Sequence, residues 1–509
     1  MCQHIESRPT EIFSRGPARA RLTETTVPIL IRCSFNPQTI AQPMRWHGVP
    51  MHNPEPPPPG PGGGIAPNPK ELRQLLALLD ARQYQAAESL ARASTVRFPL
   101  HILGWGMLAA VLRQAGRHAD ALVPMQQVIA LNPEDAHAHF NLGNTLRSLR
   151  KLDEASLAYR RALDLRPDYA KAYYGHANTM GDLGQTEDAI LLYQRALTIN
   201  PTYAQANLNL GNALQEIGQV HRALQSYRQA IRLMPNWDAP YFNLHALLLS
   251  AGDMAGAIQC MKNAVALAPT NINHHFFLGL LLDYNGNPEL AQAHFAGVKN
   301  STGLHQARLD AWHYLKSAPN SAKLPLLTGS NSHSFQIGMA AANDEGLVLE
   351  FGVRYGKSIR QIAALVDQCV HGFDSFEGLP EQWHLEPKGS YSTQGKLPRV
   401  PDHVTLHTGW FEDTLPQFLQ SHSGNVRLLN IDCDIYSSTK TVLDLLANRL
   451  VAGSVIVFDE YIGNEFWRQD EFKAFQEAVA RYGWAYEYLC FSFATKQVVT
   501  RILSVRPTA

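Results

Sequence analysis

Residues 136–169 read AHAHFNLGNTLRSLRKLDEASLAYRRALDLRPDY, and this stretch decides the fold because its pattern returns every 34 residues along the chain. Three residue types keep that period. The prolines are Pro99, Pro133, Pro167, Pro201, Pro235 and Pro269. The alanines are Ala87, Ala121, Ala155, Ala189, Ala223, Ala257 and Ala291. The glycines are Gly116, Gly184, Gly218, Gly252 and Gly286, with Arg150 in the one interrupted place. A fixed period of this length indicates a stack of repeats.

Each repeating residue type has a role in a unit of helix, turn and helix. The glycine lies between two amphipathic runs, where a left-handed turn costs least without a Cβ. The proline stops the second run and sets the turn into the next unit. The alanine lets neighbouring helices approach closely. Within residues 136–169, Phe140, Leu142 and Leu146 form one apolar stripe at helical spacing, and residues 155–163 form a second. We therefore predict an α-solenoid.

Two segments of the repeat, Asn141–Leu146 (NLGNTL) and Tyr159–Tyr169 (YRRALDLRPDY), closely resemble the tetratricopeptide family. The resemblance covers about residues 68–302, and the first and last units are less regular, as caps are. A solenoid presents an extended concave surface, so we expect a protein or an extended peptide to bind there. Carboxamides donate and accept together and can pair with a peptide backbone. The candidate peptide-binding residues are Asn141, Asn144, Asn178, Asn209, Asn212 and Asn243. A merely polar face, and repeats acting as a spacer, are the alternatives.

Composition narrows the class of protein. The chain has 509 residues, too many for one hydrophobic core, with 45% apolar residues, 17% charged residues and a formal net charge of zero. This balance provides no field that attracts nucleic acid or anionic lipid, and no run reaches the roughly 18 to 20 apolar residues that span a bilayer. We expect neither partner. The cysteines have no CxxC spacing, which favours a reducing cytoplasm; they are Cys2, Cys33, Cys260, Cys369, Cys433 and Cys490.

Residues 1–67 are predicted to be a disordered leader. Residues 54–64 read PEPPPPGPGGG, a composition that favours solvated, partly polyproline backbone over packing. The stretch before it has neither periodicity nor turn signals, and a translation start at Met44 or Met51 is one hypothesis.

From about residue 345 the pattern changes to short apolar runs that alternate with helical segments, which indicates a parallel sheet with crossover helices. We expect a Rossmann-like α/β domain over residues 345–509, after a helical linker or lid over residues 303–344. Helices follow the first, fourth and fifth strands, and the last two strands form a hairpin at the sheet edge. The seven expected strands are Leu347–Glu350, Val370–Phe373, Val404–Thr408, Val426–Ile431, Ser454–Phe458, Ala485–Cys490 and Gln497–Leu503.

The first two strand ends predict a nucleoside site, because ligands of such sheets bind beyond the carboxyl ends of the strands. After the first strand come Glu350, Gly352 and Gly356, and glycines let backbone approach a ligand. Asp374 ends the second strand, 24 residues after Glu350, about where a carboxylate meets ribose hydroxyls. A P-loop is not favoured, because Phe351 stands where its first glycine would be. A structural turn remains the alternative for the glycines.

Acidic residues follow the fourth and fifth strands. They are Asp432 and Asp434, then Asp459 and Glu460. Neighbouring strand ends bring these carboxylates together, which is costly without a cation or a shared proton. The cluster therefore binds a divalent metal or contains a general base with a raised pKa, unless the acids are simply solvated.

Four blocks in this region resemble the macrocin O-methyltransferase family: Asp374–Pro380, Gly409–Pro416, Asp432–Thr439 and Phe458–Tyr461. The resemblance spans roughly residues 345–505 and implies S-adenosylmethionine (SAM) as methyl donor. It implies Mg²⁺ at Asp432, Asp459 and Glu460, with Asp434 as the base. Asp459-Glu460 departs from the two aspartates usual in that family, which weakens the case for metal and for a sugar acceptor. The expected donor-binding residues are Glu350, Gly352, Gly356, Ser358, Asp374, Ser375, Gly409, Trp410 and Asp432.

The sequence thus predicts a SAM-dependent O-methyltransferase that acts on a sugar, polyol or glycan hydroxyl, with repeats that recruit a partner or substrate. A non-catalytic adaptor with a methyltransferase-like scaffold is the alternative. Residues 381–402 are long, polar and punctuated by glycine and proline, as binding loops are. This loop supplies Trp383, His384, Lys388, Tyr391 and Lys396 as candidate substrate contacts. We also expect the repeats and the α/β domain to fold separately, because a solenoid couples mainly to its own neighbours.

Overall fold

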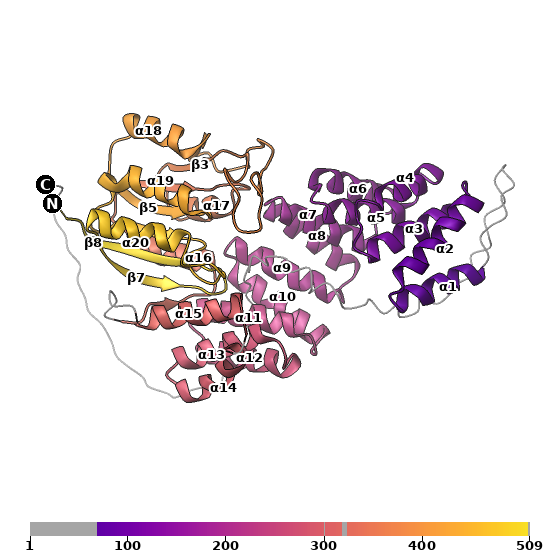
Figure 1. Cartoon of the computed structure of the whole chain (residues 1–509), viewed down its shortest axis with the longest axis horizontal. Helices are drawn as coiled ribbons and strands as arrows, with labels where there is room; N and C mark the ends of the chain where they lie inside the picture. The colour runs from indigo at the N-terminus through magenta and orange to yellow at the C-terminus, as the bar shows by residue number, and fades with distance from the viewer. Residues whose placement is uncertain (1–68, 300, 318–322, 507–509) are drawn as a thin grey trace, which may run out of the picture.

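The computed structural model describes residues 69–299, 301–317 and 323–506. It contains a helical solenoid followed by an α/β domain (Figure 1). The predicted leader over residues 1–67 lies outside the described residues. Among the described residues, no helix is both long enough and apolar enough to cross a membrane.

The solenoid consists of antiparallel helix pairs, as the 34-residue period predicts. Bulky tyrosines fill the spaces that glycines leave on the facing helices; a Cβ on Gly211 would lie 2.4 Å from the Tyr227 ring. The helices are α1 (Pro69–Asp80), α2 (Tyr84–Arg97), α3 (Ile102–Gln114), α4 (Leu122–Leu131), α5 (Ala136–Ser148), α6 (Leu152–Leu165), α7 (Ala170–Asp182), α8 (Thr186–Ile199), α9 (Ala204–Glu216), α10 (Val220–Leu233), α11 (Asp238–Ser250), α12 (Met254–Leu267), α13 (Ile272–Tyr284) and α14 (Pro288–Lys299).

The α/β domain is built on one sheet with the strand order β1-β7-β8-β6-β5-β2-β3-β4. All neighbours are parallel except β8, which runs antiparallel to β6 and β7. The strands are β1 (Leu326–Leu327), β2 (Leu347–Phe351), β3 (Val370–Asp374), β4 (Val404–Thr408), β5 (Val426–Ile431), β6 (Val455–Phe458), β7 (Ala485–Phe491) and β8 (Val498–Ser504). The seven expected strands are present. The expected hairpin is not the sheet edge, because β1 pairs with β7 outside it.

Helices cover both faces of the sheet. Apolar residues of α16 (Asn331–Ala341) and α17 (Lys357–Ala363) pack on one face, around Val348 and Val370. The other face, around Leu349 and Ile431, is covered by α18 (Phe411–Ser421), α19 (Tyr436–Leu446) and α20 (Glu471–Tyr482). A short 3₁₀ helix, Ala447–Arg449, follows α19. Helix α18 follows β4, where the sequence predicted none.

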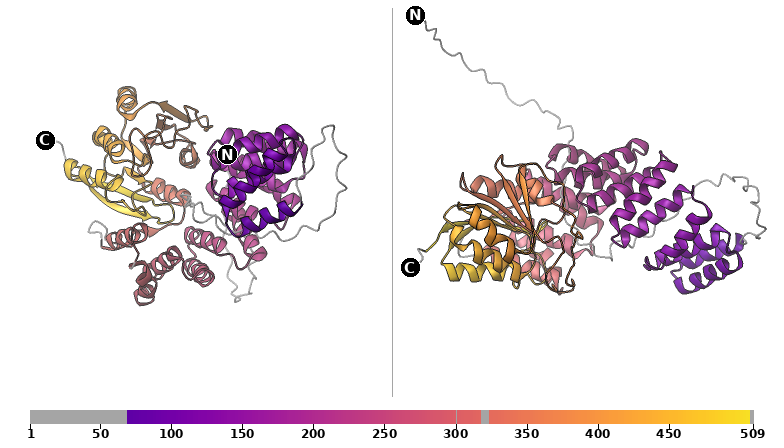
Figure 2. Two further views of the ribbon diagram at one scale, coloured as in Figure 1. Left: turned by 45° about the vertical axis from the view of Figure 1, so that its right-hand side comes forward. Right: turned by 90° about the horizontal axis from the view of Figure 1, so that it is seen from above.

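The last repeats and the sheet share one hydrophobic core. A single cluster of buried side chains runs from Tyr227 and Met261 of the solenoid to Phe458 and Phe491 of the sheet. Helix α15 (Leu304–Ser317) connects them, and the buried Trp312 ring stacks on Phe491 at 5.8 Å. Figure 1 shows α11 to α15 beneath the α/β domain, and Figure 2 shows the earlier repeats extending away from it.

Candidate functional site

The strand order reverses between β2 and β5, and ligands of such sheets bind at this switch point. The backbone hydrogen bonds of the ladder continue past the strand ends. The Asp432 N–H donates to Phe351 O at 2.8 Å, and the Asp459 N–H donates to Ile431 O at 3.0 Å. The Gly409 N–H donates to Asp374 O at 3.0 Å. The sheet therefore brings the predicted residues of five strand ends to one edge.

The loop after β2 is shaped for a close backbone approach. Gly352 has a φ of +92°, and a Cβ there would lie 1.8 Å from the carbonyl oxygen of Asp432. No other residue fits that position without moving β5. Glu350 is fully buried, and its Oε1 accepts a hydrogen bond of 2.6 Å from Ser358 Oγ. Gly356, with a φ of +72°, precedes α17.

Asp374, which the sequence predicts as a ribose ligand, is the last residue of β3. Its carboxylate oxygens accept backbone N–H bonds from Arg354 at 2.7 Å and from Phe376 at 2.6 Å. Burial raises the pKa of Asp374, and these N–H bonds oppose that shift by favouring the charged form. The carboxylate is thus fixed in orientation, which suits a group that receives hydroxyl donors.

Three further predicted donor residues, Ser375, Gly409 and Trp410, lie at the ends of the neighbouring strands β3 and β4. Ser375 Oγ accepts a hydrogen bond of 3.1 Å from the Glu377 N–H. Trp410 is the residue before α18, and Gly409 beside it has a φ of +138°. Gly409 and Trp410 directly follow β4, which pairs with β3.

The acidic residues after β5 and β6 contact side chains, whereas the sequence suggested that they bind a metal ion. Both oxygens of the buried Glu460 carboxylate accept hydrogen bonds from Lys496 Nζ, at 2.7 and 2.8 Å. Asp459 Oδ1 accepts one of 2.9 Å from Gln497 Nε2. Among the described residues, no group of three or more His, Cys, Asp or Glu side chains is placed to hold a metal ion. The predicted Mg²⁺ site at Asp432, Asp459 and Glu460 is not supported, because an ammonium already compensates Glu460.

Asp434, the predicted base, lies in a turn with a φ of +64°, where the Ile435 N–H donates to Cys433 O at 2.7 Å. Tyr391 of the long loop comes close to it. Burial, and next the charge of Asp434, raise the pKa of Tyr391 to about 12. The Arg354 guanidinium lies 4.8 Å from the centre of the Tyr391 ring. Of the predicted loop contacts, Tyr391 is thus the one whose pKa the charge of Asp434 raises.

Three of the other loop candidates contact different partners. Trp383 Nε1 donates to Asp470 Oδ2 at 3.1 Å, and His384 Nε2 lies 2.9 Å from the same oxygen. Lys396 pairs with Asp153 of α6, so the loop also touches the solenoid. These contacts fasten the loop at both ends around Tyr391.

Glu471, which sequence reasoning missed, also belongs to the site. Its side chain is fully buried, and its Oε2 accepts the Glu460 N–H at 3.0 Å. Burial, and next the charge of Asp459, raise the pKa of Glu471 well above its usual value. The residue begins an amphipathic helix, so nothing in its sequence neighbourhood distinguishes it from a surface acid.

A cavity of about 50 Å³ lies between the end of α9 and this edge of the sheet. Residues of both the solenoid and the α/β domain line this cavity. The lining residues are Gln215, Glu216, Ser330, Asn331, Ser332, Lys357, Ser358, Gln361, Asp432, Asp459, Glu460, Ala494, Thr495 and Lys496. The solenoid residues among them could not be found from sequence, because no local pattern reports which repeat faces the sheet.

The asparagine series forms hydrogen bonds inside the solenoid. Asn178 Oδ1 accepts from the Tyr193 hydroxyl at 2.6 Å and from Asn209 Nδ2 at 2.8 Å. Asn212 repeats this one unit later, accepting from the Tyr227 hydroxyl and from Asn243. Asn144 Oδ1 accepts from Tyr159, and Asn141 Oδ1 accepts from Arg113. The asparagine series therefore links neighbouring helices and repeats through its side-chain oxygens.

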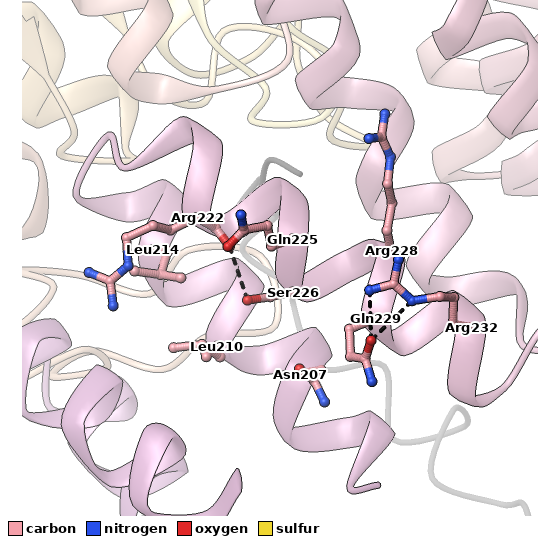
Figure 3. A pocket seen from close by; sticks show the side chains of 9 residues that line it. All are labelled: Asn207, Leu210, Leu214, Arg222, Gln225, Ser226, Arg228, Gln229 and Arg232. Carbon is pink, nitrogen blue, oxygen red and sulfur yellow. Dashed lines mark hydrogen bonds between the residues drawn. The ribbon is translucent and has the colours of Figure 1, made fainter. Parts of the chain in front are cut away.

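A larger cavity, of about 450 Å³, lies on the repeat formed by α9 and α10 (Figure 3). Arg222 lies at one side of the view and Arg228 and Arg232 at the other, and Arg232 donates to Gln229 Oε1. The lining residues are Asn207, Leu210, Leu214, Arg222, Gln225, Ser226, Arg228, Gln229 and Arg232. It does not include the predicted asparagines.

Fold and site together define a tetratricopeptide solenoid joined to a methyltransferase domain of the doubly wound type. Residues 349–461 match the family described as Methyltransferase domain. Residues 136–169 and 204–236 match Tetratricopeptide repeat families, as do residues 72–124, and residues 178–218 match a TPR repeat family. The predicted fusion and fold class are confirmed.

One curated relative is 8-demethyl-8-(2,3-dimethoxy-alpha-L-rhamnosyl)-tetracenomycin-C 4'-O-methyltransferase of Streptomyces olivaceus, 37% identical in an alignment of 144 residues that covers 23% of this chain. The chain spans about half, 53%, of that relative's length. Among solved structures, YrrB, a TPR protein with an unusual peptide-binding site, is 23% identical and covers 38% of this chain and 97% of its own, with a TM-score of 0.32. A tetratricopeptide repeat protein from Parabacteroides merdae is 17% identical, with 45% and 90% coverage and a TM-score of 0.37.

Proposed function

We propose that the chain is a SAM-dependent methyltransferase that transfers a methyl group to a hydroxyl of a sugar, polyol or glycan, and that its repeats recruit a partner or the substrate. The observation that carries the proposal is the gathering of Glu350, Gly352, Asp374 and Asp432 at the switch point of the sheet. The likeness to a rhamnosyl-tetracenomycin O-methyltransferase supports the sugar class.

The residues at the sheet edge fit the donor. Gly352 lets the loop after β2 pack against the Asp432 backbone, and Asp374 presents an oriented carboxylate to ribose hydroxyls. SAM, when bound, supplies the methyl group. The chain must chiefly orient donor and acceptor and remove the hydroxyl proton, which Asp434 would receive on a carboxylate oxygen. No metal enters this scheme, because the residues do not fit one.

The first test is calorimetry of the full chain with SAM and with S-adenosylhomocysteine (SAH). We expect both to bind, and the affinity should be unchanged by a chelator. A chain that binds neither compound would contradict the methyltransferase assignment. Transfer of a labelled methyl group from SAM to free L-rhamnose and to a panel of polyols tests the acceptor class.

Asp434→Asn should keep donor binding but lower turnover by about a hundredfold or more, because general-base catalysis typically contributes that much. Donor affinity by calorimetry and the transfer rate under saturating SAM separate the two effects. An unchanged rate would remove Asp434 from the reaction. Donor binding without transfer in the wild type, across the panel, would favour the adaptor alternative.

The recruiting role of the asparagines needs a control that preserves the solenoid. Alanine at Asn144, Asn178 and Asn212 would remove both their amide N–H groups and their bonds to Tyr159, Tyr193 and Tyr227. Phenylalanine at the three tyrosines removes only those bonds. If the repeats bind a peptide through the amides, the KM for a macromolecular acceptor should rise in the asparagine variant alone. Equal effects in both variants would indicate that the asparagine series has only a structural role.

A further inference from the structure

The cavity between α9 and the sheet edge contains a buried amide without a partner. Gln215 is 3% exposed, and neither its Nε2 nor its Oε1 has a hydrogen-bond partner among the described residues. A buried polar group left in this state is costly, so most such groups in folded proteins are satisfied by protein, water or a ligand. Gln215 lines the cavity together with Ser358 and Asp432, two of the expected donor residues.

Both domains hold this glutamine in place. The neighbouring Glu216 carboxylate pairs with Lys357 Nζ at 2.9 Å and accepts from Thr186 Oγ1 at 2.7 Å. The backbone oxygen of Glu216 accepts from Gln361 Nε2 at 2.9 Å. The end of α9 is therefore fastened to the first turns of α17, directly after the Gly352–Gly356 loop. A side chain on a helix anchored in this way is pre-organised for a ligand.

The lining of the cavity suggests the chemistry of that ligand. Lys357 and Lys496 each pair with a carboxylate of the lining, Glu216 and Glu460, and Asp432 and Asp459 add further negative charge. The acids suit the amino group of a zwitterion, and the lysine ammonium groups with the carboxamide suit its carboxylate. Asp374 and Trp410, expected at the nucleoside end of the donor, do not line the cavity. Its volume of about 50 Å³ holds about three or four waters, which is room for a small polar group and not for a nucleoside.

We propose that Gln215, a residue of the repeat solenoid, hydrogen-bonds the α-amino and α-carboxylate end of the methyl donor, so that the donor pocket is completed by the repeats. The inference rests on the proposed function. It gives the fusion a physical reason, because the repeat surface then supplies part of the binding site and not only a tether.

The test compares two thioether ligands on the full chain. SAH has the amino-acid end, and 5'-methylthioadenosine carries a methyl group in its place. The variant Gln215→Met keeps the side-chain volume and removes the amide. We expect it to weaken SAH about tenfold, the loss of one or two hydrogen bonds, and to change 5'-methylthioadenosine less than twofold. The control is Gln259→Met, at an exposed position of α12, which should leave both affinities unchanged.

The ligand-free variant should unfold at the same temperature as the wild type or higher, because it no longer buries an unpaired amide. Gln215→Ala provides a second variant if methionine does not pack. Equal weakening of both ligands, or none in either, would overturn the inference while leaving the proposed function intact. A wild type that binds neither SAH nor SAM would overturn both.

Discussion

At the scale of single residues, we expect Asp374 to contribute to donor affinity. Asp374→Ala removes a carboxylate held by two backbone N–H bonds, and it leaves the Arg354 and Phe376 amides without their acceptor. Hydrogen bonds to a charged group contribute about 1.5 to 3 kcal/mol each, so SAM should bind at least tenfold more weakly. Calorimetry measures this. Unchanged affinity in a folded variant would remove the ribose assignment.

We expect His245 to make the free energy of unfolding depend on pH. It lies fully buried in α11, and burial lowers its pKa to about 3. The unfolded chain binds a proton at this position near pH 6.5 and the folded chain does not, so its contribution to stability is lost as the pH falls below about 6.5. The loss is about 1.4 kcal/mol per pH unit for one such site.

Urea unfolding between pH 7 and 5 measures this effect. His245→Gln should reduce the slope of the unfolding free energy against pH by about one proton. The control His221→Gln, at an exposed position of α10, should leave the slope unchanged. An unaltered slope in His245→Gln would show that the imidazole is protonated in the folded protein.

At the scale of one element, helix α7 contains two glycines with opposite roles. A Cβ on Gly175 would lie 2.6 Å from the buried Tyr159 ring of the preceding repeat, whereas a Cβ on Gly181 would have nothing within 4 Å. Gly175→Ala should destabilise the protein by about 1 to 3 kcal/mol through overpacking. Gly181→Ala should stabilise it by about 0.5 to 1 kcal/mol, since glycine is a poor helix former. Thermal unfolding of the two variants compares the signs directly. Equal shifts would contradict the close helix approach.

At the scale of the whole molecule, the shared core changes the expectation for truncation. The α/β domain buries Phe491 against Trp312 and continues its core into the last repeats. The first two repeats have a separate core around Leu75 and Leu112. Deleting residues 1–134 should therefore leave SAM affinity unchanged, whereas a fragment that begins at residue 303 should expose apolar surface and bind SAM at least tenfold more weakly. Dye binding and calorimetry on the two fragments compare these outcomes. Full affinity in the shorter fragment would restore the view of two independent domains.

The sequence by itself determined the repeats and seven strands. The 34-residue period and the alternation of apolar runs are local signals, and β4 and β5 begin and end where they were expected. It also located the strand-end acids, because strand order in such sheets places them at one edge. The sequence did not predict helix α18, because Pro416, a residue that normally ends helices, lies inside it. The sequence did not predict strand β1, because a strand of two residues shows no periodicity.

Only the tertiary structure decided which charges compensate one another and which repeat meets the sheet. Lys496 pairs with Glu460 from the turn between β7 and β8, which gives this carboxylate a positive partner that the acids alone did not predict. Gln215 reaches the site from a helix more than 100 residues before it in the chain. Such contacts depend on the packing of segments far apart in sequence, and a periodic pattern carries no information about them because every repeat presents a similar face.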